Sequence, residues 1–189
     1  MTSQLSTNQL DAFWLPFTPN TEFKKRPRML ARAEGMHYFD QDGRKVLDAS
    51  AGLWCANAGH CRKPIVDAIA KAAATLDFAP TFQFGHPAAF EAAARIAALA
   101  PAGLDHVFFT NSGSESTDTA VKIAVAWHRA RGEGTRTKII GRERGYHGVG
   151  MAGISAGGIG NNRKWFGALG FQADHLPATY NRAEQAFSN

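Results

Sequence analysis

A run of small polar residues is the part of this sequence best suited to chemistry. Residues 108–116 read F-F-T-N-S-G-S-E-S, an apolar stretch followed by small polar residues and then by a long helical pattern. The first turn of a helix presents unpaired backbone N–H groups and the positive end of the helix dipole, which suit a phosphate group. Gly113 allows close approach of the backbone, and Ser112 and Ser114 add hydroxyl donors. An ordinary helix cap explains the same residues, because Ser112 and Glu115 have the spacing of a capping box.

A second motif, G-Y-H-G at residues 145–148, follows a predicted strand over residues 137–141. In an open α/β sheet, ligands bind outside the carboxyl ends of the strands, so we expect both motifs to face one pocket. Tyr146 lies between glycines, where its ring can stack on a planar ligand. An ordinary aromatic residue in a turn is the alternative. Taken together, the two motifs predict a site for a flat ring that carries a phosphate.

The elements around these motifs predict an α/β fold with a mostly parallel sheet and flanking helices. Residues 1–34 form a polar arm interrupted by prolines, and Asp42-Gly43 between apolar stretches indicates a hairpin. The glycine-rich stretch after Gly145 indicates one short helix and then an irregular loop. Helices are predicted over residues 62–76, 87–100 and 114–131, and strands over 106–110 and 137–141.

The composition is that of an ordinary globular chain. Of the 189 residues, 44% are hydrophobic and 20% are charged, and the net charge is +5. The basic cluster at residues 24–28 has no accompanying aromatic pattern, so we expect no nucleic acid partner. With no long apolar run and no secretory signal, we expect no membrane partner and a cytoplasmic location. Cys55 and Cys61 fit neither a zinc site nor a disulfide framework, so they are expected to be small buried residues and no metal is expected.

The motifs together resemble those of the class III aminotransferases, which are pyridoxal phosphate (PLP) enzymes. Besides N-S-G-S-E-S and G-Y-H-G, residues 48–54 (D-A-S-A-G-L-W), 59–60 (G-H) and 82–87 (F-Q-F-G-H-P) look like the omega-amino acid:pyruvate branch of that family. That branch includes beta-alanine–pyruvate aminotransferases. The resemblance runs from about residue 10 to the end of the chain. It implies the PLP-dependent transferase fold type I (aspartate-aminotransferase-like), which the chain fills only in part. Residues 1–60 then form an N-terminal arm and hairpin that contribute to the small domain, and residues 61–189 form the first half of the large, PLP-binding domain.

The resemblance also implies roles for particular residues in cofactor binding. Gly113 and Ser114, with Ser112, would bind the cofactor phosphate, and Tyr146 would stack on the pyridine ring. The family often has alanine at the position of Ser116, and this exchange should not disturb phosphate binding.

Three further residues are implied in substrate binding. Trp54 and Leu53 would line the pocket that receives the substrate's carboxylate and carbon chain. Phe82 would reach into the active site of the neighbouring subunit, since these enzymes build the pocket across the interface of a homodimer or higher oligomer. Packing in a core is the alternative for Trp54, and a buried interface aromatic is the alternative for Phe82.

The activity implied is transamination, in which an omega-amino acid or amine such as beta-alanine gives its amino group to pyruvate or a similar keto acid. In the family, the Schiff-base lysine and the aspartate that binds the pyridine nitrogen lie in the later half of the chain. No lysine here has the strand-end setting of the family's lysine, so no catalytic residue is assigned. The sequence therefore resembles an N-terminal fragment that is inactive alone. Two alternatives stay open: a truncated, non-catalytic PLP-fold module, or a related PLP aminomutase or decarboxylase.

Overall fold

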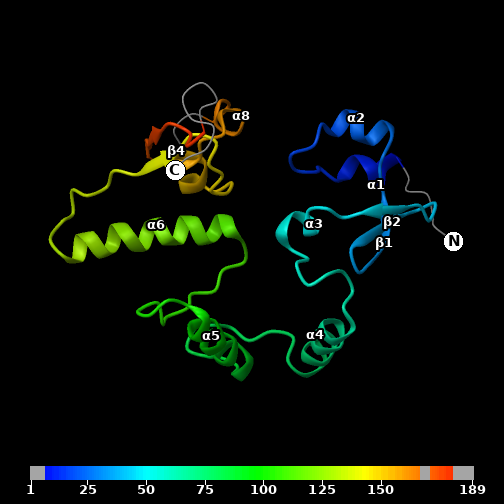
Figure 1. Ribbon diagram of the computed structural model, residues 1–189, viewed down its shortest axis with the longest axis horizontal. Helices are drawn as coiled ribbons and strands as arrows, with labels where there is room; N and C mark the ends of the chain where they lie inside the picture. The colour runs from blue at the N-terminus through cyan, green and yellow to red at the C-terminus, as the bar shows by residue number, and fades with distance from the viewer. Residues whose placement is uncertain (1–6, 167–170, 181–189) are drawn as a thin grey trace. The chain divides into compact units, whose positions relative to one another are not determined.

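The computed structural model describes residues 7–166 and 171–180, and Figure 1 shows its chain trace. The chain divides into two compact units, Met1–Pro87 and Ala88–Asn189. Each unit carries a small sheet of its own, three-stranded in the first and two-stranded in the second. The assignment of residues 1–60 to a small domain and 61–189 to a large domain stays a prediction.

The first unit contains the predicted hairpin. Strands β2 (His37–Asp40) and β3 (Lys45–Leu47) pair antiparallel, with Tyr38 opposite Val46. The connecting turn is stabilised by the Asp40 carboxylate, which accepts the N–H groups of Asp42 at 3.1 Å and Arg44 at 2.8 Å. A third strand, β1 (Leu30–Glu34), pairs antiparallel with β2. This strand lies within residues 1–34, which were expected to form only a polar arm.

The helices of the first unit are short except for one. Helix α4 runs over Lys63–Thr75, close to the predicted range, with a proline in its first turn where no N–H is needed. Its apolar side chains Ile65 and Ile69 are exposed. The other helices are α1 (Thr7–Ala12), α2 (Asn20–Lys25) and α3 (Ala51–Trp54).

The second unit confirms two predicted helices, α5 (Pro87–Leu99) and α6 (Gly113–Ala130). Strand β4 (Ile140–Arg142) pairs parallel with β5 (Asp174–Leu176), and the Lys138 ammonium lies 2.6 Å from the Asp174 carboxylate beside this pair. Between these strands lie α7 (Met151–Ala156) and α8 (Gly160–Arg163). The stretch expected to be mostly irregular is therefore more ordered than its glycines indicated.

The buried hydrophobic residues among those described lie on α7. They are Ala152, Ile154 and Ala156, and Ser155 is buried beside them. Neighbouring glycines allow this helix to pack closely on the backbone: an added Cβ at Gly153 would lie 2.5 Å from the carbonyl oxygen of His147. Around α7, close backbone contact between small residues thus takes the place of packing by large side chains.

Two sequence expectations were wrong. Residues 106–110 form no strand, and Phe108 and Phe109 are exposed. An apolar stretch becomes a strand only when a neighbouring strand accepts its hydrogen bonds, and no described residue does so here. Cys55 and Cys61 are free and exposed rather than buried. No helix in the described ranges is long and apolar enough to cross a membrane.

Candidate functional site

The start of α6 has the cap that the sequence predicted. Ser112 has extended backbone angles, and its hydroxyl accepts the N–H of Glu115 at 3.1 Å. The Glu115 carboxylate reaches back to the N–H of Asn111 at 2.8 Å, one residue earlier than in the standard capping box. The cap therefore exists, and it occupies only part of the donors at this helix start.

Two backbone donors at the same helix start are still open. Within residues 7–166 and 171–180, the N–H groups of Gly113 and Ser114 have no hydrogen-bond acceptor. They lie at the positive end of an 18-residue helix. An added Cβ at Gly113 would have no heavy atom within 4 Å. Both groups are thus available to an anion, as the sequence predicted for a phosphate.

The two sequence motifs meet directly at Ser114. The N–H of Val149 donates to the Ser114 hydroxyl oxygen at 3.0 Å. Gly148 lies so close that an added Cβ would be 2.6 Å from the Ser114 Cα. Because the Ser114 oxygen already accepts a hydrogen bond, its own proton is left to donate to a ligand. The G-Y-H-G loop and the helix start thus form one structural feature, although 35 residues separate them.

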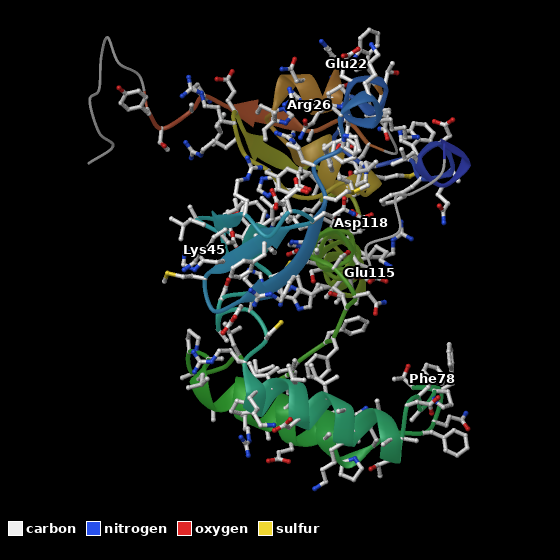
Figure 2. All side chains as sticks on the ribbon, turned by 90° about the vertical axis from the view of Figure 1, so that its right-hand side faces the viewer. Glu22, Arg26, Lys45, Phe78, Glu115 and Asp118 are labelled. Atoms are coloured by element: carbon white, nitrogen blue, oxygen red, sulfur yellow. The ribbon has the colours of Figure 1, made fainter. Side chains whose placement is uncertain are left out.

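Asp118 holds the same two segments together, a role that neither sequence motif indicated. It lies one turn after Ser114 on α6, and Figure 2 labels it on this helix together with Glu115. Its carboxylate accepts the N–H groups of Ala152 at 3.1 Å and Gly153 at 3.2 Å. Its Oδ1 lies 2.8 Å from the position of an added Cβ at Gly150. The signal in the sequence was a matching spacing. Ser114 and Asp118 are four residues apart on α6, and they lie against Gly148 and Gly150, which are two residues apart.

Tyr146 lies on the loop that this packing fixes. The loop's first residue, Gly145, accepts the N–H of Gly158 at 2.8 Å and donates to the carbonyl oxygen of Arg142 at 3.0 Å. The Tyr146 side chain is 48% exposed, so its ring is available for stacking. The residues of the second unit therefore fit a phosphate at Gly113 and Ser114 with an aromatic ring on the neighbouring loop.

The predicted substrate residues lie in the first unit. Leu53 and Trp54 belong to α3, and Trp54 is 74% exposed. Phe82 is 86% exposed and precedes Gln83, which has a positive φ of 66°. None of these three side chains is packed in a core of the described residues, so the core-packing alternative for Trp54 has no support there. Across residues 7–166 and 171–180, no group of three or more His, Cys, Asp or Glu side chains is placed to hold a metal.

The turn that carries Leu53 and Trp54 has an unusual backbone. Every residue from Ala51 to Trp54 has a positive φ: 50°, 58°, 54° and 72° in order. Gly52 tolerates this conformation, but each of the other three residues is strained by about 1–2 kcal/mol in it. Such strain persists only where surrounding contacts hold it, and it is common at ligand sites.

Comparison with known proteins gives the family. The sequence matches the family described as aminotransferase class III over residues 20–188. It is 62% identical over 173 residues to an omega-aminotransferase of Caulobacter vibrioides, covering 92% of this chain and 39% of that protein. It is 54% identical over 170 residues to a beta-alanine–pyruvate aminotransferase of Pseudomonas aeruginosa, covering 90% of this chain and 38% of that one. The chain belongs to the class III aminotransferase family.

A solved structure supports the fold as well. An amine transaminase from an uncultivated Pseudomonas species, crystallised with PLP bound, is 31% identical and superposes with a TM-score of 0.83. The match covers 92% of this chain and 40% of that one. The prediction of a PLP-dependent transferase fold is confirmed. The chain spans about two fifths of the length of the relatives that it matches.

Proposed function

We propose that the protein containing this chain is an aminotransferase that moves an amino group from an omega-amino acid or amine, such as beta-alanine, to pyruvate or a similar keto acid. The names of the similar proteins, which are 62% and 54% identical to this chain over the matched residues, support this reaction. The observation that carries the proposal is the junction at Ser114, where open N–H donors, a free hydroxyl proton and the Tyr146 loop adjoin.

PLP is the cofactor that this junction would hold. The N–H groups of Gly113 and Ser114 would donate to the phosphate, and the hydroxyls of Ser112 and Ser114 would add their remaining protons. Tyr146 would cover one face of the pyridine ring and exclude water from it. Bound PLP supplies an electron sink next to the reacting carbon, a role that no amino-acid side chain can fill.

The substrate side of the proposal rests on the first unit. Trp54 and Leu53 would form an apolar wall along the carbon chain of the amine, which favours substrates whose amine lies far from the carboxylate. Phe82 would serve the active site of the neighbouring copy in a homodimer.

The first experiment measures PLP affinity of the purified protein by absorbance titration. Ser114→Ala removes a hydroxyl donor to a charged phosphate, and we expect PLP to bind about tenfold to a hundredfold more weakly. Ser116→Ala is the matched control. The Ser116 hydroxyl lies 2.6 Å from that of Thr110 and 3.2 Å from the carbonyl oxygen of Ser112, so it serves the protein rather than the ligand. Equal PLP affinities of the two variants would contradict the assignment.

The second experiment measures the reaction itself. Beta-alanine and pyruvate are supplied, and alanine formation is followed with and without PLP. Formation of alanine that depends on both substrates and on PLP supports the proposal. Turnover without any keto acid, either with release of carbon dioxide or with isomerisation of the amine, would show a decarboxylase or an aminomutase instead. PLP binding without turnover would show a non-catalytic module.

A further inference from the structure

A buried carboxylate lies behind the strained turn in the first unit. The Asp48 side chain is 4% exposed. One of its oxygens, Oδ2, accepts the N–H of Gly52 at 2.7 Å and lies 2.7 Å from Nε2 of His60. The other oxygen accepts from Ser50, at 3.0 Å from its N–H and 3.2 Å from its hydroxyl. All of these donors lie in the turn or in the histidine that follows it.

The same carboxylate oxygen therefore joins the turn to His60. Gly52 lies within the left-handed run Ala51–Trp54, and its N–H is held by Oδ2 rather than by the helix. The hydrogen bond from His60, followed by the N–H donors of Ser50 and Gly52, lowers the pKa of Asp48. Asp48 is thus charged at neutral pH, and charged acceptors hold their donors more strongly than neutral ones.

His60 is itself fixed to the three-stranded sheet, at the connection between β1 and β2. Its N–H and carbonyl oxygen exchange two hydrogen bonds with Gly35, at 2.7 Å and 3.1 Å. Its ring is 13% exposed and lies against the ring of Tyr38, with centroids 4.4 Å apart. A continuous set of contacts therefore runs from the antiparallel sheet through His60 and Asp48 to the turn that carries Leu53 and Trp54.

We propose that Asp48 and His60 are positioning residues for the substrate pocket. Their contact holds Ala51–Trp54 in the left-handed conformation, and this conformation determines where Leu53 and Trp54 stand against the amine substrate. The pair thereby determines which amines are accepted, without touching them. The specificity part of this inference rests on the proposed function, because that function assigns Leu53 and Trp54 to the substrate pocket.

Three variants of the pair test the inference in the purified protein loaded with PLP. His60→Leu removes the donor and Asp48→Asn removes the charge. His60→Gln keeps an N–H donor near the position of Nε2 and is the conservative replacement. Asp67→Asn is the matched control, because Asp67 pairs with Lys63 at 2.9 Å in the same unit, but on the exposed surface of α4.

The first measurement is amide hydrogen exchange of residues 50–55. We expect exchange to be at least about tenfold faster in His60→Leu and Asp48→Asn, less accelerated in His60→Gln, and unchanged in Asp67→Asn. Unchanged exchange in the first two variants would overturn the positioning role. This measurement needs no enzymatic activity, so it remains decisive even if the proposed reaction fails.

The second measurement is the steady-state kinetics with a small and a bulky amine donor. We expect KM for the amine to rise about tenfold in His60→Leu, with a changed preference between the two amines and with PLP affinity retained. His60→Gln should recover part of the original KM. Faster exchange with an unchanged KM and preference would overturn the specificity role and, with it, the placement of Leu53 and Trp54 in the substrate pocket.

Discussion

Two segments of this chain depart from regular helix and strand geometry, and they are held by different means. Around residues 145–158, glycines let the backbone approach other backbone and the side chains of Ser114 and Asp118. Around Ala51–Trp54, three residues that are not glycine adopt positive φ, and a buried carboxylate and an imidazole hold them there. The first segment depends chiefly on missing side-chain atoms, with the Asp118 carboxylate accepting two of its N–H groups. The second depends on a buried carboxylate and its hydrogen bonds.

Because of this difference, we expect the two segments to be sensitive to different changes: added side-chain atoms in the first and loss of charge in the second. A close backbone approach is disrupted by a single added methyl group and is indifferent to pH. A turn held by hydrogen bonds to a charged carboxylate tolerates some steric change but responds to the loss of that charge. The two segments carry the proposed cofactor loop and the proposed substrate residues respectively, so the comparison also predicts which substitutions affect which ligand.

The largest effect is expected for Gly148→Ala. The new Cβ would lie 2.6 Å from the Ser114 Cα, and alanine would have to adopt a φ of 106°. Crowding and backbone strain together should lower the free energy of unfolding by about 3 kcal/mol. Guanidinium denaturation measures this, with Gly134→Ala as the control, because Gly134 has no positive φ and an open environment. Similar denaturation midpoints for the two variants would show that the close packing is unimportant.

Asp118→Ala is expected to have the next largest effect. It leaves the N–H groups of Ala152 and Gly153 without their acceptor, at a cost of about 2 kcal/mol. Asp118→Asn keeps one acceptor oxygen and should lose about half as much. Thermal unfolding gives the comparison, and Asp67→Ala, which removes an exposed acid, should leave the transition unchanged. Equal losses for alanine and asparagine at position 118 would show that the hydrogen bonds do not stabilise α7.

The sequence predicted the start of α6 better than the packing around it. Helix α6, its Ser112 cap and its open donors follow from local chemistry, because a cap needs only the residues beside it. Gly148 and Asp118 could not be placed in the same way. A glycine in a sequence shows where a Cβ is missing but not which atom approaches it. The strand expected at residues 106–110 failed for a related reason, since strand formation depends on a partner outside the segment.

The turn at Ala51–Trp54 was beyond local reasoning altogether. Alanine, leucine and tryptophan favour negative φ, so their types argue against the conformation that they adopt. The contacts that impose it come from Asp48 and His60, which are 12 residues apart. Both residues stood out only through the family resemblance of their segments, and the resemblance gave them no role. A conflict between local preference and observed backbone is expected where function constrains the chain.

Two glycines in the first unit test how strongly steric crowding constrains the turn at Ala51–Trp54. Gly43 and Gly52 both have positive φ, 80° and 58°. An added Cβ at Gly43 meets nothing within 4 Å, whereas at Gly52 it would lie 3.1 Å from the Tyr38 hydroxyl. Gly43→Ala should cost about 1 kcal/mol and Gly52→Ala about 1.5 kcal/mol, measured by denaturation. A larger loss at Gly43 would show that the hydroxyl moves away freely and that sterics contribute little to the turn.

The smallest effect is a dependence on pH at the turn Ala51–Trp54, whose Gly52 N–H the Asp48 carboxylate accepts. The pKa of Asp48 is lowered below the usual 3.8, chiefly by the hydrogen bond from His60. Its charge therefore stabilises the folded state fully above pH 3.8, and this contribution is lost as the pH falls through the lowered pKa. Burial and the nearby Asp48 charge raise the pKa of Tyr38, so Tyr38 stays neutral throughout.

Asp48→Asn should thus destabilise the protein most at pH 6, and the difference from wild type should shrink as the pH falls below 3.8. Gly148→Ala serves as the internal reference, because crowding does not titrate and its destabilisation should be the same across this range. Denaturant unfolding of the three proteins at pH 6, 4 and 3 makes the comparison. A constant difference for Asp48→Asn would mean that hydrogen-bond geometry, and not charge, holds the turn. The two segments would then differ in the contacts that hold them but not in their response to pH.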